Sequence, residues 1–262
     1  MGKNGSSVGY RFSVSDIVSA FHCPLQFYFR KKGIKAYFRY GNVHIGSFVH
    51  NVLSVFAKEI EKPTLFNEKR EGYIERKLYQ AFLSVSISKH YNVDFEEGWR
   101  YLKSIGAYFE NLAYKKSIPE IKEMFLLSEE SFLIRLAGAY ISGRFDLLLD
   151  VGNDIRIIDY KTRGKEIDID AVQIAIYRYA VEKIYKKKAS PYVLYIGDGE
   201  ISEEYFSDEE YTELMKQINK EIRDMKDFLE GNKIPLPTPE RSLCRYCSIQ
   251  YRCEELIKKY FT

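Results

Sequence analysis

Residues 141–161 read ISGRFDLLLDVGNDIRIIDYK, and this stretch decides the fold. Alternating segments flank Gly152-Asn153, a pair suited to positive φ, so the stretch predicts a β-hairpin with a tight turn. With that pair in the turn, Asp146 is expected to lie directly opposite Asp159 on the partner strand, because the turn sets the register.

Two facing carboxylates repel each other, and the pair is tolerable if a hard divalent cation lies between the oxygens. Lys161 follows Asp159 by two residues and therefore points to the same face of its strand. Two acids and a lysine at the end of a hairpin predict a metal-assisted site for phosphodiester cleavage. On residue types alone a plainer interpretation stays open, because Asp and Lys are also common at exposed strand ends.

The composition is that of a globular domain. The chain has 262 residues, of which 45% are hydrophobic and 29% charged, enough to bury a sizeable core. Its net charge of +3 neither demands nor excludes a nucleic-acid partner, because a local basic surface matters more than the total. No apolar run is long enough for a membrane span, and the first residues lack the apolar region of a signal peptide. We therefore expect a cytoplasmic protein without a membrane partner.

The order of predicted elements is helices, a strand, the hairpin, a helix, strands and a helix, which predicts an α/β fold with a mixed sheet. We divide the chain into a flexible leader (1–12), an N-terminal helical region (13–123), a core (124–230) and a C-terminal cysteine-rich segment (231–262). Within them we predict helices from about Val14, over about 47–62 and 170–187, and from Ser207 to Glu230 before Gly231, and a helical insertion over about 67–117. We also predict a strand over 124–136 and a second hairpin, whose strands at 191–197 and 201–206 are separated by Asp198-Gly199-Glu200.

Four cysteines form a separate pattern. Cys244, Cys247 and Cys253 share one compact loop, whereas Cys23 lies more than 200 residues earlier and precedes a proline. Without an export signal, disulfides are not expected, and four thiols suit an iron–sulfur cluster or an all-thiolate zinc site. Structural zinc usually takes two paired C-x2-C units, so the split of three plus one favours the cluster. Either centre would clip the two ends of the chain together.

Several motifs then coincide: G-x-x-D at Gly143–Asp146, D-Y-K at Asp159–Lys161, Q-x-x-x-Y at Gln173–Tyr177, and His50 on an earlier helix. With them the chain resembles the RecB-like branch of the PD-(D/E)xK nuclease superfamily. The cysteine arrangement resembles that of its iron–sulfur members. Because no helicase motif or Walker A sequence is present, the resemblance is to the CRISPR-associated RecB-like exonuclease family. None of these motifs covers the helical stretch over 67–117.

The resemblance implies a restriction-endonuclease-like core and a metal-dependent DNA exonuclease that acts on single-stranded or frayed DNA ends. It implies these roles: Mg²⁺ or Mn²⁺ binding by His50, Asp146, Asp159 and the backbone carbonyl of Tyr160; catalysis by Lys161 with Asp146 and Asp159; DNA binding by Gln173 and Tyr177; and ligation of an iron–sulfur cluster, with [4Fe–4S] favoured, by Cys23, Cys244, Cys247 and Cys253. Arg144, Arg163 and Lys165 are further candidates for phosphate contacts.

The resemblance also implies a setting, namely the trimming of DNA before its capture as CRISPR spacers, beside integrase proteins. Three alternatives stay open. The chain could be a general DNA-repair nuclease of the RecB-like type, a non-catalytic iron–sulfur adaptor that binds DNA, or a zinc-clipped RNA-processing factor. The paired acids and the lysine favour a nuclease over an adaptor.

Overall fold

The computed structural model describes residues 9–34, 43–62, 68–87, 93–162, 167–197, 200–240, 242, 244, 247 and 249–261. The strands are β1 (Arg11–Ser13), β2 (Phe125–Leu136), β3 (Ala139–Asp150), β4 (Ile155–Lys161), β5 (Ala189–Gly197) and β6 (Glu200–Tyr205). The helices are α1 (Val14–His22), α2 (Pro24–Lys31), α3 (Val43–Glu61), α4 (Tyr73–Ile87), α5 (Phe95–Leu112), α6 (Ile118–Met124), α7 (Ile167–Tyr185), α8 (Asp208–Glu230), the 3₁₀ helix η2 (Gln250–Arg252) and α9 (Cys253–Phe261).

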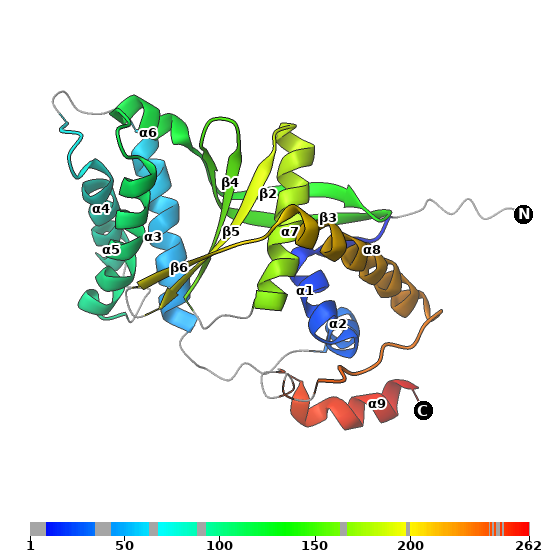
Figure 1. Cartoon of the computed structure of the whole chain (residues 1–262). Helices are drawn as coiled ribbons and strands as arrows, with labels where there is room; N and C mark the ends of the chain where they lie inside the picture. Colours follow the sequence, from blue (N-terminus) through cyan, green and yellow to red (C-terminus); the bar gives the residue numbers. More distant parts are fainter. Residues whose placement is uncertain are drawn as a thin grey trace, which may run out of the picture.

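A mixed sheet separates two layers of helices (Figure 1), which confirms the predicted α/β class. Strands follow the order β1-β3-β4-β5-β6, and β2 pairs with the other edge of β3. One apolar core lies between the sheet and α1, α7 and α8, and a second lies between the opposite face and α3, α4 and α5. The described helices include none that is both long and apolar enough to cross a bilayer.

The central hairpin has the predicted turn and register. Val151 N donates to Asp154 O at 3.1 Å, and Gly152 has a φ of 103°, which a residue without a Cβ adopts freely. Asp150 pairs with Ile155, as the turn requires.

The expected Asp146–Asp159 pair is not part of the ladder, because the ladder ends one position before it. The last β3–β4 pair is Leu147 with Ile158. Beyond it, β4 continues along β5, while the same edge of β3 turns to β1, which pairs with Tyr140–Ser142. The two acidic residues therefore lie where two strands part, which opens the sheet at this point.

The N-terminal end of the fold also differs from expectation. The leader predicted for 1–12 ends earlier, because Arg11 to Ser13 form β1, parallel to β3. Its residues 1–8 lie outside the described part of the chain. The helix predicted from about residue 47 begins already at Val43, and the helical stretch predicted for 67–117 contains α4 and α5 within the second core.

Gly143 of the G-x-x-D motif is required by close packing. A Cβ at this position would lie 2.5 Å from Cζ of Phe132 and 2.8 Å from Cγ2 of Val14. The Phe132 ring cannot easily give way, because it stacks on Phe145 with 4.6 Å between ring centroids. We therefore expect Gly143→Ala to lower the free energy of unfolding by about 1–3 kcal/mol, the usual cost of overpacking a core.

Urea unfolding would measure this effect, with Gly106→Ala in α5 as the matched control. There the nearest atom to a new Cβ is the flexible end of Leu78, at 3.1 Å, and alanine is favoured over glycine inside a helix. The packing argument fails if both variants unfold at the same urea concentration as the unmodified protein.

Candidate active site

The opening between β3 and β4 positions two buried carboxylates. Asp146 and Asp159 are only 9% and 1% exposed. Oδ2 of Asp146 accepts a hydrogen bond from the Tyr160 backbone N–H at 3.0 Å, which replaces the ladder bond that β4 loses when it leaves β3. The strand separation therefore fixes the Asp146 side chain against the backbone of the D-Y-K motif.

His50 reaches the same place from α3. Its helix packs Val49 and Leu53 into the second core, which leaves His50 at the edge of the apolar face. Nε2 of His50 lies 3.2 Å from the backbone carbonyl oxygen of Tyr160, and Nδ1 lies 3.7 Å from Oδ1 of Asp146. The structure thus brings together three of the four predicted metal ligands.

Glu129 on β2 is a fourth member that the sequence analysis missed. Its Oε1 lies 3.5 Å from Nδ1 of His50, and its Oε2 lies 2.8 Å from Nε of Arg144. Ligand atoms of His50, Glu129 and Asp146 all lie within 4.8 Å of one another. Glu129 has a φ of 54°, a left-handed backbone conformation that is uncommon for a residue with a side chain.

Lys161 and Gln173 hold the second acid in place. Nζ of Lys161 lies 2.6 Å from Oδ2 of Asp159 and 3.9 Å from Oδ1 of Asp170. Nζ of Lys161 also donates to Oε1 of Gln173 at 3.1 Å, and Nε2 of Gln173 donates to Oδ1 of Asp159 at 2.9 Å. Asp159 is therefore ion-paired with Lys161 and lies outside the close group of His50, Glu129 and Asp146.

The predicted Q-x-x-x-Y face on α7 points into the site. Nε2 of Gln173 lies 2.9 Å from the hydroxyl of Tyr177, one helical turn later. The Tyr177 ring packs edge-on against Phe145 at 5.5 Å, so the apolar core orients its hydroxyl. Two further candidates, Arg163 and Lys165, lie outside the described residues.

The buried carboxylates of the site shift the pKa of Asp146 and of the nearby cationic groups. Burial and the nearby Asp159 carboxylate raise the pKa of Asp146 to about 7. Burial opposes the charge on His50, but Glu129 and Asp146 outweigh it and raise the His50 pKa. Burial likewise opposes the charge on Lys161, and Asp159 outweighs it and raises the Lys161 pKa. Such a group of repelling carboxylates favours a bound cation.

The donor set fits a divalent cation that prefers oxygen. It offers carboxylates, a peptide carbonyl and one imidazole nitrogen, a combination that suits Mg²⁺ and, because of the imidazole, Mn²⁺. These side chains come from α3, β2 and β3, and the carbonyl comes from β4. The complete ligand set therefore exists only when α3 is packed on the sheet.

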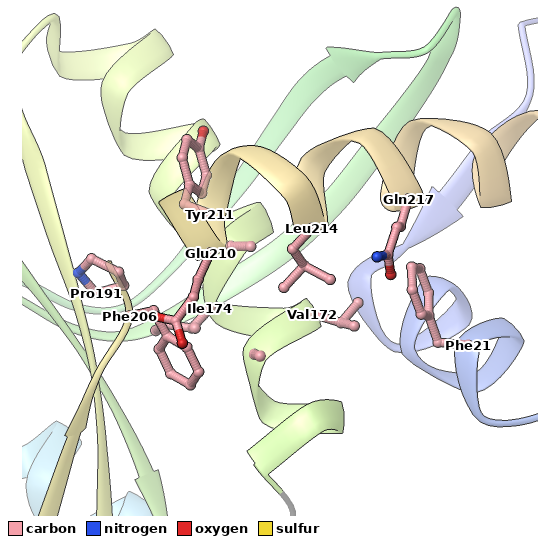
Figure 2. A pocket seen from close by; sticks show the side chains of 11 residues that line it. Phe21, Val172, Ile174, Pro191, Phe206, Glu210, Tyr211, Leu214 and Gln217 are labelled. Atoms are coloured by element: carbon pink, nitrogen blue, oxygen red, sulfur yellow. The ribbon is translucent and has the colours of Figure 1, made fainter. Parts of the chain in front are cut away.

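An apolar cavity of about 320 Å³ adjoins α7, and its lining contains none of the site residues described above. Figure 2 shows side chains of α1, α7 and α8 around it, among them Val172 and Leu214. Glu210 also lines it, but Oε2 of Glu210 accepts from the Ser207 backbone N–H at 2.8 Å as part of the predicted α8 cap. The cavity therefore lies at the packing contact between α1, α7 and α8.

The four cysteines meet at the other end of the molecule. All of them line one cavity of about 420 Å³, between the junction of α1 with α2 and the segment that leads into α9, and none is in a disulfide. Leu25 and Phe29 of α2 pack there against Ile249 and Leu256, so α2 and the C-terminal segment with α9 lie next to each other (Figure 1). Burial, and then the nearby Cys23 and Cys244, raise the pKa of the Cys247 thiol.

Comparisons with known proteins agree with this geometry. A family model described as the PD-(D/E)XK nuclease superfamily matches residues 11–254. A subunit of an ATP-dependent helicase/deoxyribonuclease from Caldanaerobacter subterraneus subsp. tengcongensis is 28% identical over an alignment of length 279 that covers 86% of this chain and 24% of the relative. A crystal structure titled "Putative exonuclease" from Eubacterium rectale covers 94% of this chain and 93% of its own, with a TM-score of 0.53 and 14% identity, a likeness that shows the fold.

Proposed function

Because the chain belongs to the PD-(D/E)XK nuclease superfamily, we propose that it is a metal-dependent deoxyribonuclease that shortens single-stranded or frayed DNA ends. One observation supports this most: His50, Glu129 and Asp146 bring three ligand atoms within 4.8 Å of one another, beside the carbonyl of Tyr160. Lys161 lies at the end of the adjoining strand β4, where its ammonium group can stabilise the negative charge of a phosphate.

Each residue of the site has a distinct task in this proposal. His50, Asp146, Asp159 and the Tyr160 carbonyl would hold Mg²⁺ or Mn²⁺, with Glu129 as a further carboxylate. A cation held there would supply Lewis-acid polarisation of the phosphate and a more acidic water. Lys161 stabilises the charge that develops on the phosphate oxygens.

Gln173 and Tyr177 keep the catalytic amine and the DNA strand in place. Because Gln173 contacts both Lys161 and Asp159, it orients this pair and leaves its amide next to the Tyr177 hydroxyl. We assign the same two side chains to contacts with the strand near the scissile bond. Arg144, which is exposed and paired with Glu129, lies where an incoming phosphate would meet it.

A strand-resolved assay tests the proposal. Purified protein is incubated with DNA labelled at either the 5′ or the 3′ end, with Mg²⁺, with Mn²⁺ or with EDTA. We expect cleavage only with a divalent cation, with single strands and frayed ends cut faster than blunt duplexes. Cation-independent cleavage, or an absence of cleavage under every condition, would rule the proposal out.

The physiological setting has two candidates. The first is the trimming of DNA for CRISPR spacers beside integrase proteins. The second is general processing of DNA ends, which is favoured by the similarity to a helicase/deoxyribonuclease subunit, although this chain spans about a quarter of that relative. Co-purification with a CRISPR integrase supports the first setting, and stimulation by a helicase partner supports the second.

For the cysteine cavity we propose an iron–sulfur cluster with a structural role. All four thiols line the cavity. The three-plus-one spacing and Cys23-Pro24 match cluster ligation better than paired zinc knuckles. A centre here would tie α2 to α9 at the place where their apolar side chains already meet.

Replacing Cys244 and Cys247 together by serine is expected to remove iron, sulfide and visible colour from the purified protein. It should also lower the thermal unfolding temperature, because metal-binding energy is folding energy. Cys23→Ser, at the opposite end of the chain, is expected to have the same effects. A colourless unmodified protein that contains zinc would replace the cluster by the zinc alternative.

A further inference from the structure

The outer face of strands β1, β2 and β3 is exposed and lies next to the proposed active site. The inner face of these strands carries Phe12, Ile134 and Ile141 into the first core. The outer face carries exposed residues of a different kind, namely Arg11, Ser131, Leu133, Arg135, Tyr140 and Arg144. We call this set the arginine–tyrosine face. This face is opposite the one that α1, α7 and α8 cover, and in Figure 1 strand β3 runs away from α3, α4 and α5 toward the other side of the molecule.

The strand register places three of these side chains in one row. Arg11 on β1 and Arg135 on β2 both pair with Tyr140 on β3, and directly paired residues point to the same face of a sheet. Tyr140, which is 45% exposed, therefore lies between two arginine positions in this row. Leu133, which is 52% exposed, belongs to the next row along β2.

The same face leads from this row to the metal ligands. Arg144 follows Tyr140 by four residues on β3 and therefore points to the same side. Nε of Arg144 lies 2.8 Å from Glu129, whose other oxygen approaches His50. With about 3.3 Å of rise per residue, Tyr140 lies roughly 20 Å along β3 from Asp146. The row and the proposed active site are thus two ends of one continuous surface.

The chemistry of the face suits a single strand of nucleic acid. Its charged residues are all arginines, and among the described residues neither Arg11 nor Arg135 has a carboxylate within ion-pairing distance. Guanidinium groups bind phosphates, and an exposed tyrosine ring offers a stacking surface for a base. A duplex keeps its bases stacked on each other, so only an unpaired strand can use the ring.

We propose that the arginine–tyrosine face holds the single-stranded part of the DNA substrate on its way to the metal site. This inference rests on the proposed nuclease function and adds a path for the strand. Arg11 and Arg135 bind phosphates on both sides of a base that stacks on Tyr140, and Arg144 receives the phosphate nearest to the metal ligands.

Binding of a fluorescent single-stranded oligothymidine, followed by anisotropy in EDTA so that no cleavage occurs, tests the path. Tyr140→Ala is expected to raise the Kd by about 5- to 150-fold, since stacking on an aromatic side chain contributes about 1–3 kcal/mol per base. The double variant Arg11→Ala with Arg135→Ala is expected to reduce the slope of log Kd against log salt by about 1.4, because each phosphate that is no longer neutralised changes the slope by about 0.7.

Matched controls are Tyr114→Ala and Arg100→Ala, which remove an exposed tyrosine and an exposed arginine on the α5 side of the molecule. Both should bind the oligothymidine like the unmodified protein. Thermal unfolding of every variant and its affinity for Mn²⁺ show whether the fold and the metal site persist. Variants of the arginine–tyrosine face that keep their fold and their affinity for Mn²⁺ but lose affinity for DNA support the path.

The outcomes separate the two proposals. If the unmodified protein cuts DNA but the Tyr140 and arginine variants bind the oligothymidine as tightly as it does, the path is overturned and the nuclease function stands. If those variants lose affinity for duplex DNA and keep it for single strands, the assignment to a single strand is overturned. If the unmodified protein shows no cation-dependent cleavage, the nuclease function itself fails.

Discussion

Asp146→Asn is expected to lower the rate of DNA cleavage by about a thousandfold or more and to leave the protein folded. The carboxylate belongs to the close group with His50 and Glu129, so the variant loses a charged ligand where a cation contributes several kcal/mol to catalysis. Each 1.36 kcal/mol changes the rate tenfold. The asparagine oxygen can still accept the hydrogen bond from the Tyr160 backbone N–H, so the strand end remains supported.

The same variant should not be less stable without metal, and near neutral pH it should be slightly more stable. The pKa of Asp146 is raised from 3.8 to about 7, so the folded protein binds a proton that the unfolded chain has already released. Stability of the metal-free protein should therefore fall as the pH rises from about 4 to 7, and the neutral asparagine should weaken that dependence. Asp150→Asn is the control, because Asp150 lies in the same hairpin and pairs with Lys187 outside the site.

These results are measured by initial cleavage rates, Mn²⁺ titration and urea unfolding at several pH values. Asp146→Asn protein that keeps a normal cleavage rate would contradict the assignment of this residue. Loss of stability at pH 7 without metal would contradict the charge argument and would leave the ligand role in place.

Lys161→Ala is expected to cost both activity and stability. Its ammonium group lies 2.6 Å from Asp159, which is 1% exposed, so the variant leaves a buried carboxylate without its cation. Breaking a buried pair in this way typically costs about 3–5 kcal/mol of folding free energy. Loss of charge stabilisation on the phosphate should reduce the cleavage rate by about 10²–10³.

Two variants separate these effects. Lys161→Arg keeps the charge and should keep most of the stability, but the larger planar group should not restore the cleavage rate. Lys187→Ala removes an exposed lysine from its pair with Asp150 and should change stability by less than about 1 kcal/mol. If Lys161→Ala unfolds at the same denaturant concentration as the unmodified protein, the pair with Asp159 is not structural, and the ion pair does not carry the energy assigned to it.

Local chemistry explains why much of the fold could be predicted. A glycine at positive φ makes the 152–153 turn, and alternation around it sets the register of the hairpin. Ser207 and Glu210 form the predicted capping box of α8, and Gly231, with a φ of 80°, ends that helix. Gln173 and Tyr177 lie four residues apart on a helix and therefore meet. Each of these features depends only on residues close together in the chain.

The site was only partly predictable, because it depends on where distant strands separate. Alternation along β2 cannot tell which of Glu129 and Glu130 faces His50, and the left-handed backbone at Glu129 decides it. The pairing of Asp159 with Lys161 follows from the departure of β4 from β3, which no turn residue encodes.

By itself, the sequence determined most element types, the turn and register of the hairpin and the helix caps, because these follow from backbone conformation and side-chain period over a few residues. Only the tertiary structure decided that β1 joins β3 and that Glu129 meets His50 and Asp146. The physical reason is that such contacts arise from the packing of whole layers on a sheet, in which burial of apolar surface brings together residues that share no local signal.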